Sequence, residues 1–165
     1  MAHHVHAAGR QGLVVAAEDR GQVGVTRADM RDPDGVLGAP GVRDLLDPAR
    51  PTALLTVAVL HFVPDADLPA ILGRYHEALA PGSVHVMSHG SSDHDDPALA
   101  ASTRAIQDGY RGSATEVVLR TRDQIRELLG SDDLVAPGMV DIVDWPTPSP
   151  GERPTGGYAA IARLP

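Results

Sequence analysis

The 165-residue sequence contains no cysteine, and it also lacks lysine and asparagine. Without cysteine there is no disulfide framework, no thiolate metal site and no cysteine nucleophile, which excludes zinc fingers and thiol proteases. Aromatic residues make up only 3% of the chain, so few rings are available to stack on single-stranded nucleic acid. The core must therefore be built from aliphatic side chains, which can pack densely.

Basic clusters and long apolar runs are missing as well. The formal net charge is -8, and the fourteen basic residues are spread along the chain, so a phosphate backbone would be repelled. The longest apolar run, near residues 53–60, is far shorter than the roughly 20 residues that span a bilayer. The first residues contain no apolar stretch of the kind found in signal peptides. We expect a cytoplasmic protein with neither nucleic-acid nor membrane partners.

Hydrophobic residues at 42% and charged residues at 22% are ordinary values for a globular protein. The length suits one domain with a substantial core, so we expect a single domain over residues 1–165. Within it, residues 1–26 form a weakly specified lead-in. The first twenty residues are expected to be irregular or a frayed helix, and the valine alternation over 22–26 predicts a short strand.

The clearest structural pattern is a strand, a helix and a strand between residues 53 and 88. Ala53 to Leu60 is nearly all apolar, which is typical of a strand buried on both faces of a parallel sheet. Asp67 can cap a helix, Pro81-Gly82 can end it, and its apolar residues have helical spacing: Leu68, Ile71, Leu72, Tyr75 and Leu79. Residues 83–88 then form a second strand, which should run parallel to the first.

Shorter signals complete the expected fold. We predict helices that cover 42–46 and 97–110, and one that Thr121 opens and Gly130 stops. Apolar stretches within 134–143 and 157–162 can add strands at the edge of the sheet. The sequence therefore predicts an α/β protein with an open, mostly parallel Rossmann-like sheet and an antiparallel carboxyl-terminal edge.

Three predicted strands end in polar residues that could form a site. The first leads into Asp29 and Met30, the second into His61 and Phe62, and the third into His89. If these strands are parallel neighbours, Asp29, His61 and His89 face one crevice, because open α/β sheets bind ligands at the carboxyl ends of their strands. Each residue also has a structural interpretation: Asp29 as a turn or cap residue, and each histidine as a packed, hydrogen-bonded side chain.

The segment 89–96 contains two imidazoles and three carboxylates, a composition that could bind a divalent metal. Because these residues have no fixed helical or strand spacing, we favour a solvated loop and predict no metal site. Sequence motifs of NTPases, zinc proteases, α/β-hydrolases and dinucleotide-binding enzymes are not found.

The order of several motifs resembles a bacterial family of S-adenosyl methyltransferases that was long catalogued as a domain of unknown function. The resemblance covers the chain from about Arg27 to its end. It is carried by these stretches: Ala28-Asp29-Met30-Arg31-Asp32-Pro33, Arg50-Pro51, Val57-Ala58-Val59-Leu60-His61-Phe62-Val63-Pro64-Asp65, Ala80-Pro81-Gly82-Ser83, Ser88-His89 and Gly157-Tyr158. It implies a class I methyltransferase fold, S-adenosyl-L-methionine as cofactor and a small-molecule acceptor.

The resemblance also implies site residues. It places Asp29 and Met30 near the adenine of the cofactor, and Ala58, Val59, His61 and Phe62 along the crevice for cofactor and substrate. If the acceptor must lose a proton, His61 and His89 are the candidate catalytic bases, because imidazole titrates near neutral pH.

One departure from the family concerns the amino-terminal part. Full-length relatives have an upstream strand with a glycine-rich turn, which is not evident before Arg27, so we expect a truncated chain that matches the carboxyl-terminal two-thirds of the domain. Loss of that turn would impair cofactor binding. One alternative is a noncatalytic α/β remnant that binds a partner chain or self-associates as a homo-oligomer. Another is an unrelated nucleotide-binding α/β module.

Overall fold

The computed structural model describes residues 13–17, 22–94, 96–112, 116–148, 150–151 and 155–165. The chain divides into two compact units, Met1–Pro48 and Ala49–Pro165. The expectation of a single domain stays a prediction beside this division.

The first unit contains a two-stranded antiparallel sheet of β1 (Leu13–Ala17) and β2 (Gln22–Thr26). β2 confirms the strand predicted over 22–26. β1 lies where an irregular segment or frayed helix was expected, so that expectation is wrong for 13–17, and the rest of the predicted lead-in before β2 lies outside the described residues. β2 and β1 form a two-stranded sheet of their own. Val25 is 75% exposed, unlike a residue of a central parallel strand.

Two short helices follow in the first unit, α1 (Pro33–Leu37) and α2 (Pro40–Arg43). Each has proline in its first turn, where a missing N–H does no harm. The carboxylate of Asp32 accepts a hydrogen bond from the Gly35 N–H at 3.0 Å and so caps α1. The helix predicted over 42–46 is thus found earlier, and it ends at Arg43.

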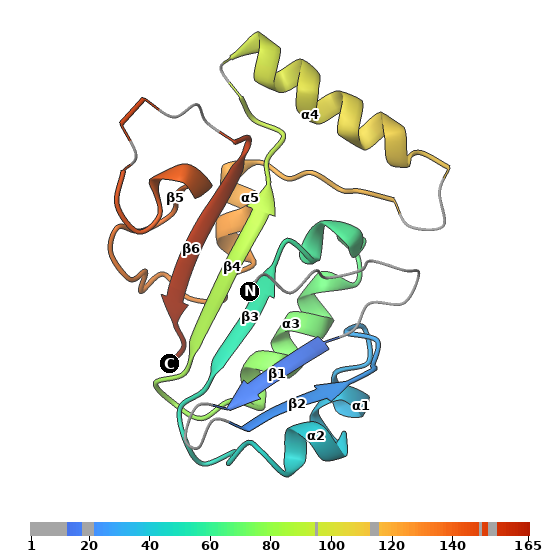
Figure 1. The fold of residues 1–165 in the computed structure, drawn as a ribbon, viewed down its shortest axis with the longest axis vertical. Coiled ribbons are helices and arrows are strands. Elements are labelled where there is room, and N and C mark those ends of the chain that lie inside the picture. The colour runs from blue at the N-terminus through green and yellow to red at the C-terminus, as the bar shows by residue number, and fades with distance from the viewer. Residues whose placement is uncertain (1–12, 18–21, 95, 113–115, 149, 152–154) are drawn as a thin grey trace. The chain divides into compact units, whose positions relative to one another are not determined.

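The second unit contains a four-stranded sheet with the order β3-β4-β6-β5. Its strands are β3 (Ala53–Val57), β4 (Val84–Gly90), β5 (Val140–Asp141) and β6 (Gly157–Arg163). β3 and β4 are parallel, β6 runs antiparallel to β4, and β5 runs antiparallel to β6 (Figure 1). The open sheet and its antiparallel carboxyl-terminal side are confirmed. The sheet is mixed, however, with one parallel pair among the described strands, and not mostly parallel as predicted.

β3 differs from its prediction in length and in burial. The apolar run continues to Leu60, but the strand ends at Val57 and the chain then forms a 3-10 turn, η2 (Leu60–Phe62). Among the described strands β3 lies at the edge of its sheet, and Leu55 and Val57 remain 55% and 57% exposed. The expected burial on both faces is therefore wrong, because the apolar run reports hydrophobicity and not the number of covering layers.

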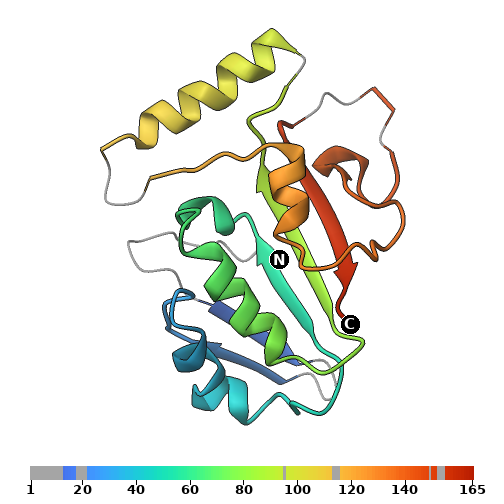
Figure 2. The same ribbon diagram turned by 180° about the vertical axis from the view of Figure 1, so that it is seen from behind.

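The predicted strand-helix-strand unit is confirmed by α3 (Leu68–Glu77), which connects β3 to the parallel strand β4. Asp67 is the residue before the helix, but its side chain makes no capping hydrogen bond, so its predicted capping role is wrong. Figures 1 and 2 show α3 and α5 (Arg122–Glu127) on the same side of the sheet. Four buried residues of α3 supply apolar contacts there: Leu68, Ile71, Leu72 and Tyr75.

The remaining helices agree closely with the sequence. α4 spans Pro97–Tyr110 as predicted, and Figure 1 shows it beyond the carboxyl ends of β3 and β4. Thr121 and Gln124 form a capping box at the start of α5, which ends at Glu127, two residues before Leu129. A last 3-10 turn, η3, covers Ile142–Asp144. Over the described residues, the helices are too short or too polar to cross a membrane.

Candidate functional site

The carboxyl end of β3 is conformationally strained. Ala58 has a φ of 52°, the left-handed region that side chains other than glycine rarely adopt. Its N–H lies 3.1 Å from both the carbonyl and the hydroxyl oxygen of Ser88 at the end of β4. The strain therefore turns the chain sharply out of the sheet while one backbone group stays attached to β4. Such outliers are frequent at ligand sites, where neighbouring contacts hold them in place.

A row of rings begins in the turn that follows. The rings of His61 and Phe62 pack edge to face with centroids 4.3 Å apart, and Phe62 contacts Tyr110 of α4 at 5.9 Å. On its other side, His61 packs against His89 of β4 at 5.5 Å and an interplanar angle of 89°. Two of the predicted site residues, His61 and His89, are thus brought together at the carboxyl ends of β3 and β4.

His61 has a ring nitrogen that is poorly satisfied. Its Nδ1 is buried and, within the described structure, has no hydrogen-bond partner. A buried polar atom without a partner is destabilising and rare in native proteins. Burial, and secondarily the nearby charge of Arg120, lowers the pKa of His61 from its usual value. The imidazole is therefore neutral at physiological pH and chemically able to accept a proton.

His89 is held differently, because both of its nitrogens are engaged. Nδ1 lies 2.7 Å from the carbonyl oxygen of Gly90, and Nε2 lies 2.8 Å from Nη1 of Arg120. Burial of the ring lowers the pKa of His89 to about 4, and the charge of Arg120 acts in the same direction. A role for His89 as a base stays a prediction, and it would require the guanidinium to leave Nε2.

Arg120 is the most deeply buried charged side chain near these rings, with 2% exposure. Its Nε donates to Oδ1 of Asp65 at 2.8 Å, and its Nη2 donates to the carbonyl of Val63 at 2.8 Å. Nη1 donates to the carbonyl of Leu60 at 3.1 Å, besides its contact with His89. One guanidinium therefore joins η2, the residues after η2 and the end of β4.

The backbone around Arg120 makes the same connections. The N–H of Val118 donates to the carbonyl of His61 at 2.8 Å, and the N–H of Ser92 donates to the carbonyl of Arg120 at 2.9 Å. Residues 118–120 thus lie between the turn that carries His61 and the loop after β4. The turn is held through both the backbone and a side chain of this segment.

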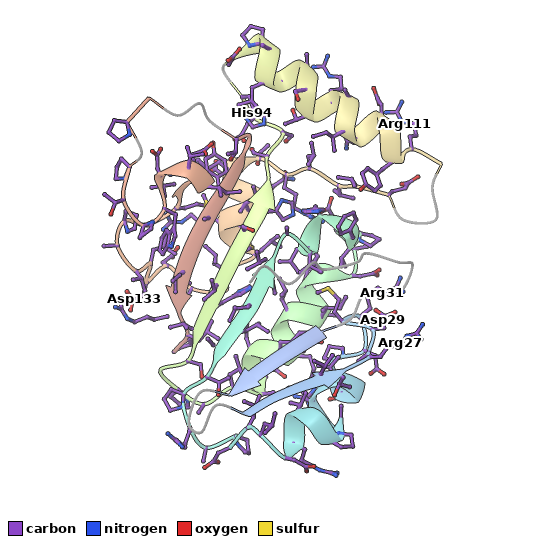
Figure 3. All side chains as sticks on the ribbon, in the orientation of Figure 1. Arg27, Asp29, Arg31, His94, Arg111 and Asp133 are labelled. Atoms are coloured by element: carbon purple, nitrogen blue, oxygen red, sulfur yellow. The ribbon has the colours of Figure 1, made fainter. Side chains whose placement is uncertain are left out.

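The polar loop after β4 is largely tied down in the structure. Ser91 is fully buried, and its hydroxyl contacts the carboxylate of Asp93 and the carbonyl of Arg120. The other carboxylate oxygen of Asp93 accepts from the N–H of Arg122 at 2.8 Å. His94, which Figure 3 labels between β4 and α4, places Nε2 2.8 Å from the carbonyl of Ser91. The expectation of a solvated loop is therefore wrong for Ser91, whereas Ser92 and Asp93 are exposed.

In the first unit, Asp29 and Met30 follow β2 as expected. The carboxylate of Asp29 accepts hydrogen bonds from the guanidinium of Arg31 at 2.6–3.1 Å. Figure 3 labels both residues. This hydrogen bonding lowers the pKa of Asp29. Met30 is buried at 6% exposure. The convergence of Asp29 with His61 and His89 stays a prediction, because it joins residues of different units.

Arg120, Asp65 and Tyr110 were not singled out from the sequence. Arg120 follows the apolar residues 117–119, a position where its burial could have been suspected, but nothing local identifies its partners. Those partners lie 31 to 60 positions away in the chain. Among the residues that the structure describes, no three histidine or carboxylate side chains are arranged to hold a metal ion.

Two solved structures resemble the chain in both sequence and fold. A DUF574 family protein from Streptomyces avermitilis is 34% identical, with a TM-score of 0.74 over 85% of this chain and 54% of its own. A candidate methyltransferase from Thermobifida fusca is 31% identical, with a TM-score of 0.76 over 89% of this chain and 55% of its own. The chain thus spans about half the length of these two structures. No protein of curated function matches it significantly.

The family comparison covers almost the whole chain. The model described as "S-adenosyl methyltransferase" matches residues 5–165. Together with the two structural relatives, this match confirms the resemblance seen in the motifs. The chain belongs to the S-adenosyl methyltransferase family.

Proposed function

We propose that this chain takes part in S-adenosylmethionine-dependent methyl transfer to a small-molecule acceptor. The family match over residues 5–165 is the observation that carries the proposal. The strained residue Ala58 and the two imidazoles at the carboxyl ends of β3 and β4 support it, since ligands of open α/β sheets bind at this edge.

The residues at this edge fit a ligand that completes the site. Among the described residues the buried Nδ1 of His61 has no partner, and Ala58 holds a strained backbone conformation. Both features are expected where a bound molecule supplies the missing contacts. We propose that Ala58, Val59, His61 and Phe62 line the cofactor and substrate crevice. Asp29 and Met30, in the same proposal, contact the adenine.

Methyl transfer requires the protein mainly to orient the reacting groups. S-adenosylmethionine, when bound, supplies a methyl group activated by a positively charged sulfur. The residues of the chain hold the acceptor atom in line with the bond that breaks, which is the main source of rate in a displacement. The imidazole of His61 takes the proton that the acceptor loses, because it is neutral at physiological pH and lies in the turn after β3.

The acidic charge of the chain and its lack of basic clusters favour a small molecule over nucleic acid as the acceptor.

Calorimetric titration with S-adenosylhomocysteine tests the proposal on the full chain. Wild-type protein should release or absorb heat on binding, and Asp29→Ala should weaken affinity by about tenfold, as expected for loss of a hydrogen bond to a charged group. Asp108→Ala is the matched control, since Asp108 is 50% exposed and pairs with Arg111, much as Asp29 is 48% exposed and pairs with Arg31.

The outcomes separate two claims. Absence of heat with the wild-type chain would overturn the proposed activity of this chain. Equal affinity in the wild-type and Asp29→Ala proteins would remove Asp29 from the site and leave the activity standing.

The second candidate is a noncatalytic module that self-associates. It is supported by β3, an edge strand with Leu55 and Val57 more than half exposed, because such edges pair readily with another chain. Sedimentation should then show a dimer that Leu55→Thr with Val57→Thr converts to a monomer. A monomeric wild-type chain that binds S-adenosylhomocysteine would exclude this candidate.

A further inference from the structure

The placement of Arg120 is unusual for a charged residue. Its side chain is 2% exposed, whereas its ionic partner Asp65 is 66% exposed and lies at the surface. A buried guanidinium is unfavourable unless hydrogen bonds satisfy its donors. Here they are satisfied by the backbone carbonyls of Leu60 and Val63 and by the ring of His89. The apolar core alone gives no reason to place a charge at this point.

We propose that Arg120 is a positioning residue, which holds the His61-Phe62 turn against the end of β4 and fixes His89 as an uncharged acceptor. This proposal rests on the proposed function for its catalytic consequence, and on the contacts alone for its structural part.

The tautomer of His89 follows from elementary chemistry. A carbonyl oxygen only accepts, so Nδ1, at 2.7 Å from the Gly90 oxygen, must carry the proton. A guanidinium only donates, so Nε2, at 2.8 Å from Nη1 of Arg120, must be the unprotonated nitrogen. A second proton on His89 would bring two N–H groups together. His89 therefore works as the acceptor that orients Arg120.

The turn is held at both of its ends. Arg120 binds the carbonyl of Leu60, just before His61, and the carbonyl of Val63, just after Phe62. The N–H of Val118 binds the carbonyl of His61 between them. The carbonyls of Leu60, His61 and Val63 are therefore all bonded to residues 118–120, and this backbone carries the rings of His61 and Phe62. Any movement of Arg120 is transmitted to both rings.

The two histidines thereby have different roles. His89 has no nitrogen left for an acceptor molecule, while the ring of His61 is partly exposed and its Nδ1 has no partner in the part of the chain that the structure describes. Charged and titratable groups around His89 are His61, Arg120 and Asp65. We therefore assign proton transfer to His61 and positioning to His89 and Arg120.

The first test uses nuclear magnetic resonance of the histidine rings in the full chain without ligand. Wild-type His89 should show the Nδ1–H tautomer and no titration between pH 5 and 8. In Arg120→Lys the charge remains, but the forked geometry of the donors is lost. The Nε2 signal of His89 should then move because that nitrogen loses its fixed donor, and the ring signals of His61 should shift. Unchanged His89 Nε2 and His61 signals in the variant would overturn the proposal.

The second test compares two replacements of His89 and remains informative if Arg120→Lys does not fold. Glutamine can place an oxygen near the position of Nε2 and keep the bond to Arg120, whereas asparagine is too short to do so. His89→Gln should bind S-adenosylhomocysteine within about twofold of wild type, and His89→Asn about tenfold more weakly, the effect of one lost charge-assisted bond.

Failure of this proposal and failure of the proposed function are distinguishable. If the wild-type chain does not bind S-adenosylhomocysteine, the ring signals of His61 still decide the matter: His89→Gln should preserve them and His89→Asn should shift them. Equal loss in both variants would mean that the imidazole itself is needed, and it would overturn the positioning role.

Discussion

β4 buries one histidine in each of its halves, His85 and His89, on the same face of the sheet. The two imidazoles differ in their hydrogen-bond partners. His85 is fully buried, with Nε2 2.8 Å from the hydroxyl of Thr56 and Nδ1 3.1 Å from His76 of α3. All three groups can donate and accept, so the network needs no charge. His89 instead faces the guanidinium of Arg120.

The difference shows which end of the strand is built for packing and which for a site. At His85 the partners are neutral side chains of β3 and α3, which tie the sheet to its covering helix. At His89 a charge is brought in from residue 120 and is used to hold backbone carbonyls of η2. Both rings have a pKa lowered to about 4, mainly by burial, but only one of them lies at the carboxyl end of the strand.

The largest expected effect is a loss of stability in mild acid, to which His85 and His89 should contribute equally. The unfolded chain takes up protons on both near pH 6.5, whereas the folded chain resists until about pH 4. Stability should therefore be complete above pH 6.5 and fall as the pH drops toward 4, by about 3 kcal/mol for each ring. Urea unfolding between pH 5 and 7 measures the slope.

The same measurement separates the two halves of β4. His89→Gln should remove the share of the slope that His89 contributes and leave the equal share of His85. Lowered pKa values of His61 and His76, again through burial, add to the slope in the same direction. A free energy of unfolding that does not change between pH 5 and 7 would show that neither ring is held neutral.

The next largest effect is expected on removal of Arg120, the buried charge beside His89. Arg120→Met should lower the free energy of unfolding by about 2–5 kcal/mol, because the carbonyls of Leu60 and Val63 lose their buried donor. Arg126→Met is the matched control: Arg126 is 46% exposed and pairs with Asp132, which is 93% exposed. Its loss should stay below about 1 kcal/mol. Urea unfolding at pH 7.5 measures the free energy of unfolding of both variants. Similar losses would mean that the buried contacts of Arg120 stabilise the fold no more than an exposed ion pair does.

In the half of β4 that contains His85, the packing of its partner His76 can be tested by a substitution at Gly130. Gly130 has a φ of 72°, and a Cβ there would lie 2.5 Å from the ring of His76. Gly138 has a φ of 91° and no atom near its would-be Cβ. Both alanine variants should lose about 1–2 kcal/mol through the left-handed backbone. Only Gly130→Ala should also shift the ring signals of His76 and His85, and equal spectra would contradict the contact.

The smallest effect is expected at the hydroxyl that ends the neutral network. Thr56→Val keeps the shape of the side chain but removes its hydrogen bond with His85, and should lower the free energy of unfolding by about 1 kcal/mol. The ring signals of His85 should change, and those of His89 should not. A matching change at His89 would mean that the two halves of β4 are coupled.

Much of the fold was predictable where the signal is local. The helical spacing after Leu68 and the start signal at Thr121 act within a few residues, so α3 and the start of α5 were expected where they occur, as was α4. The burial of β3 was not, because the same apolar run suits a central strand or an edge strand. Whether β3 becomes a central or an edge strand depends on which segments pair with it.

The candidate site was predictable only in part, for the same reason. His61 and His89 were expected at the carboxyl ends of neighbouring parallel strands, and the strand-helix-strand order does bring them within 5.5 Å. Arg120 was not expected there, because its contacts reach 57 positions back to Val63 and 31 back to His89. No local pattern encodes those pairs.

The amino-acid sequence by itself determined the family, the strand-helix-strand unit with the two helices that follow it, and the residue types at the strand ends, because propensity, capping and hydrophobic period act over short distances along the chain. The tertiary structure alone decided that His85 lies in a neutral network and His89 beside a buried cation. Burial and hydrogen-bond partners depend on segments that meet only after folding, and these, not the residue type, set what an imidazole can do.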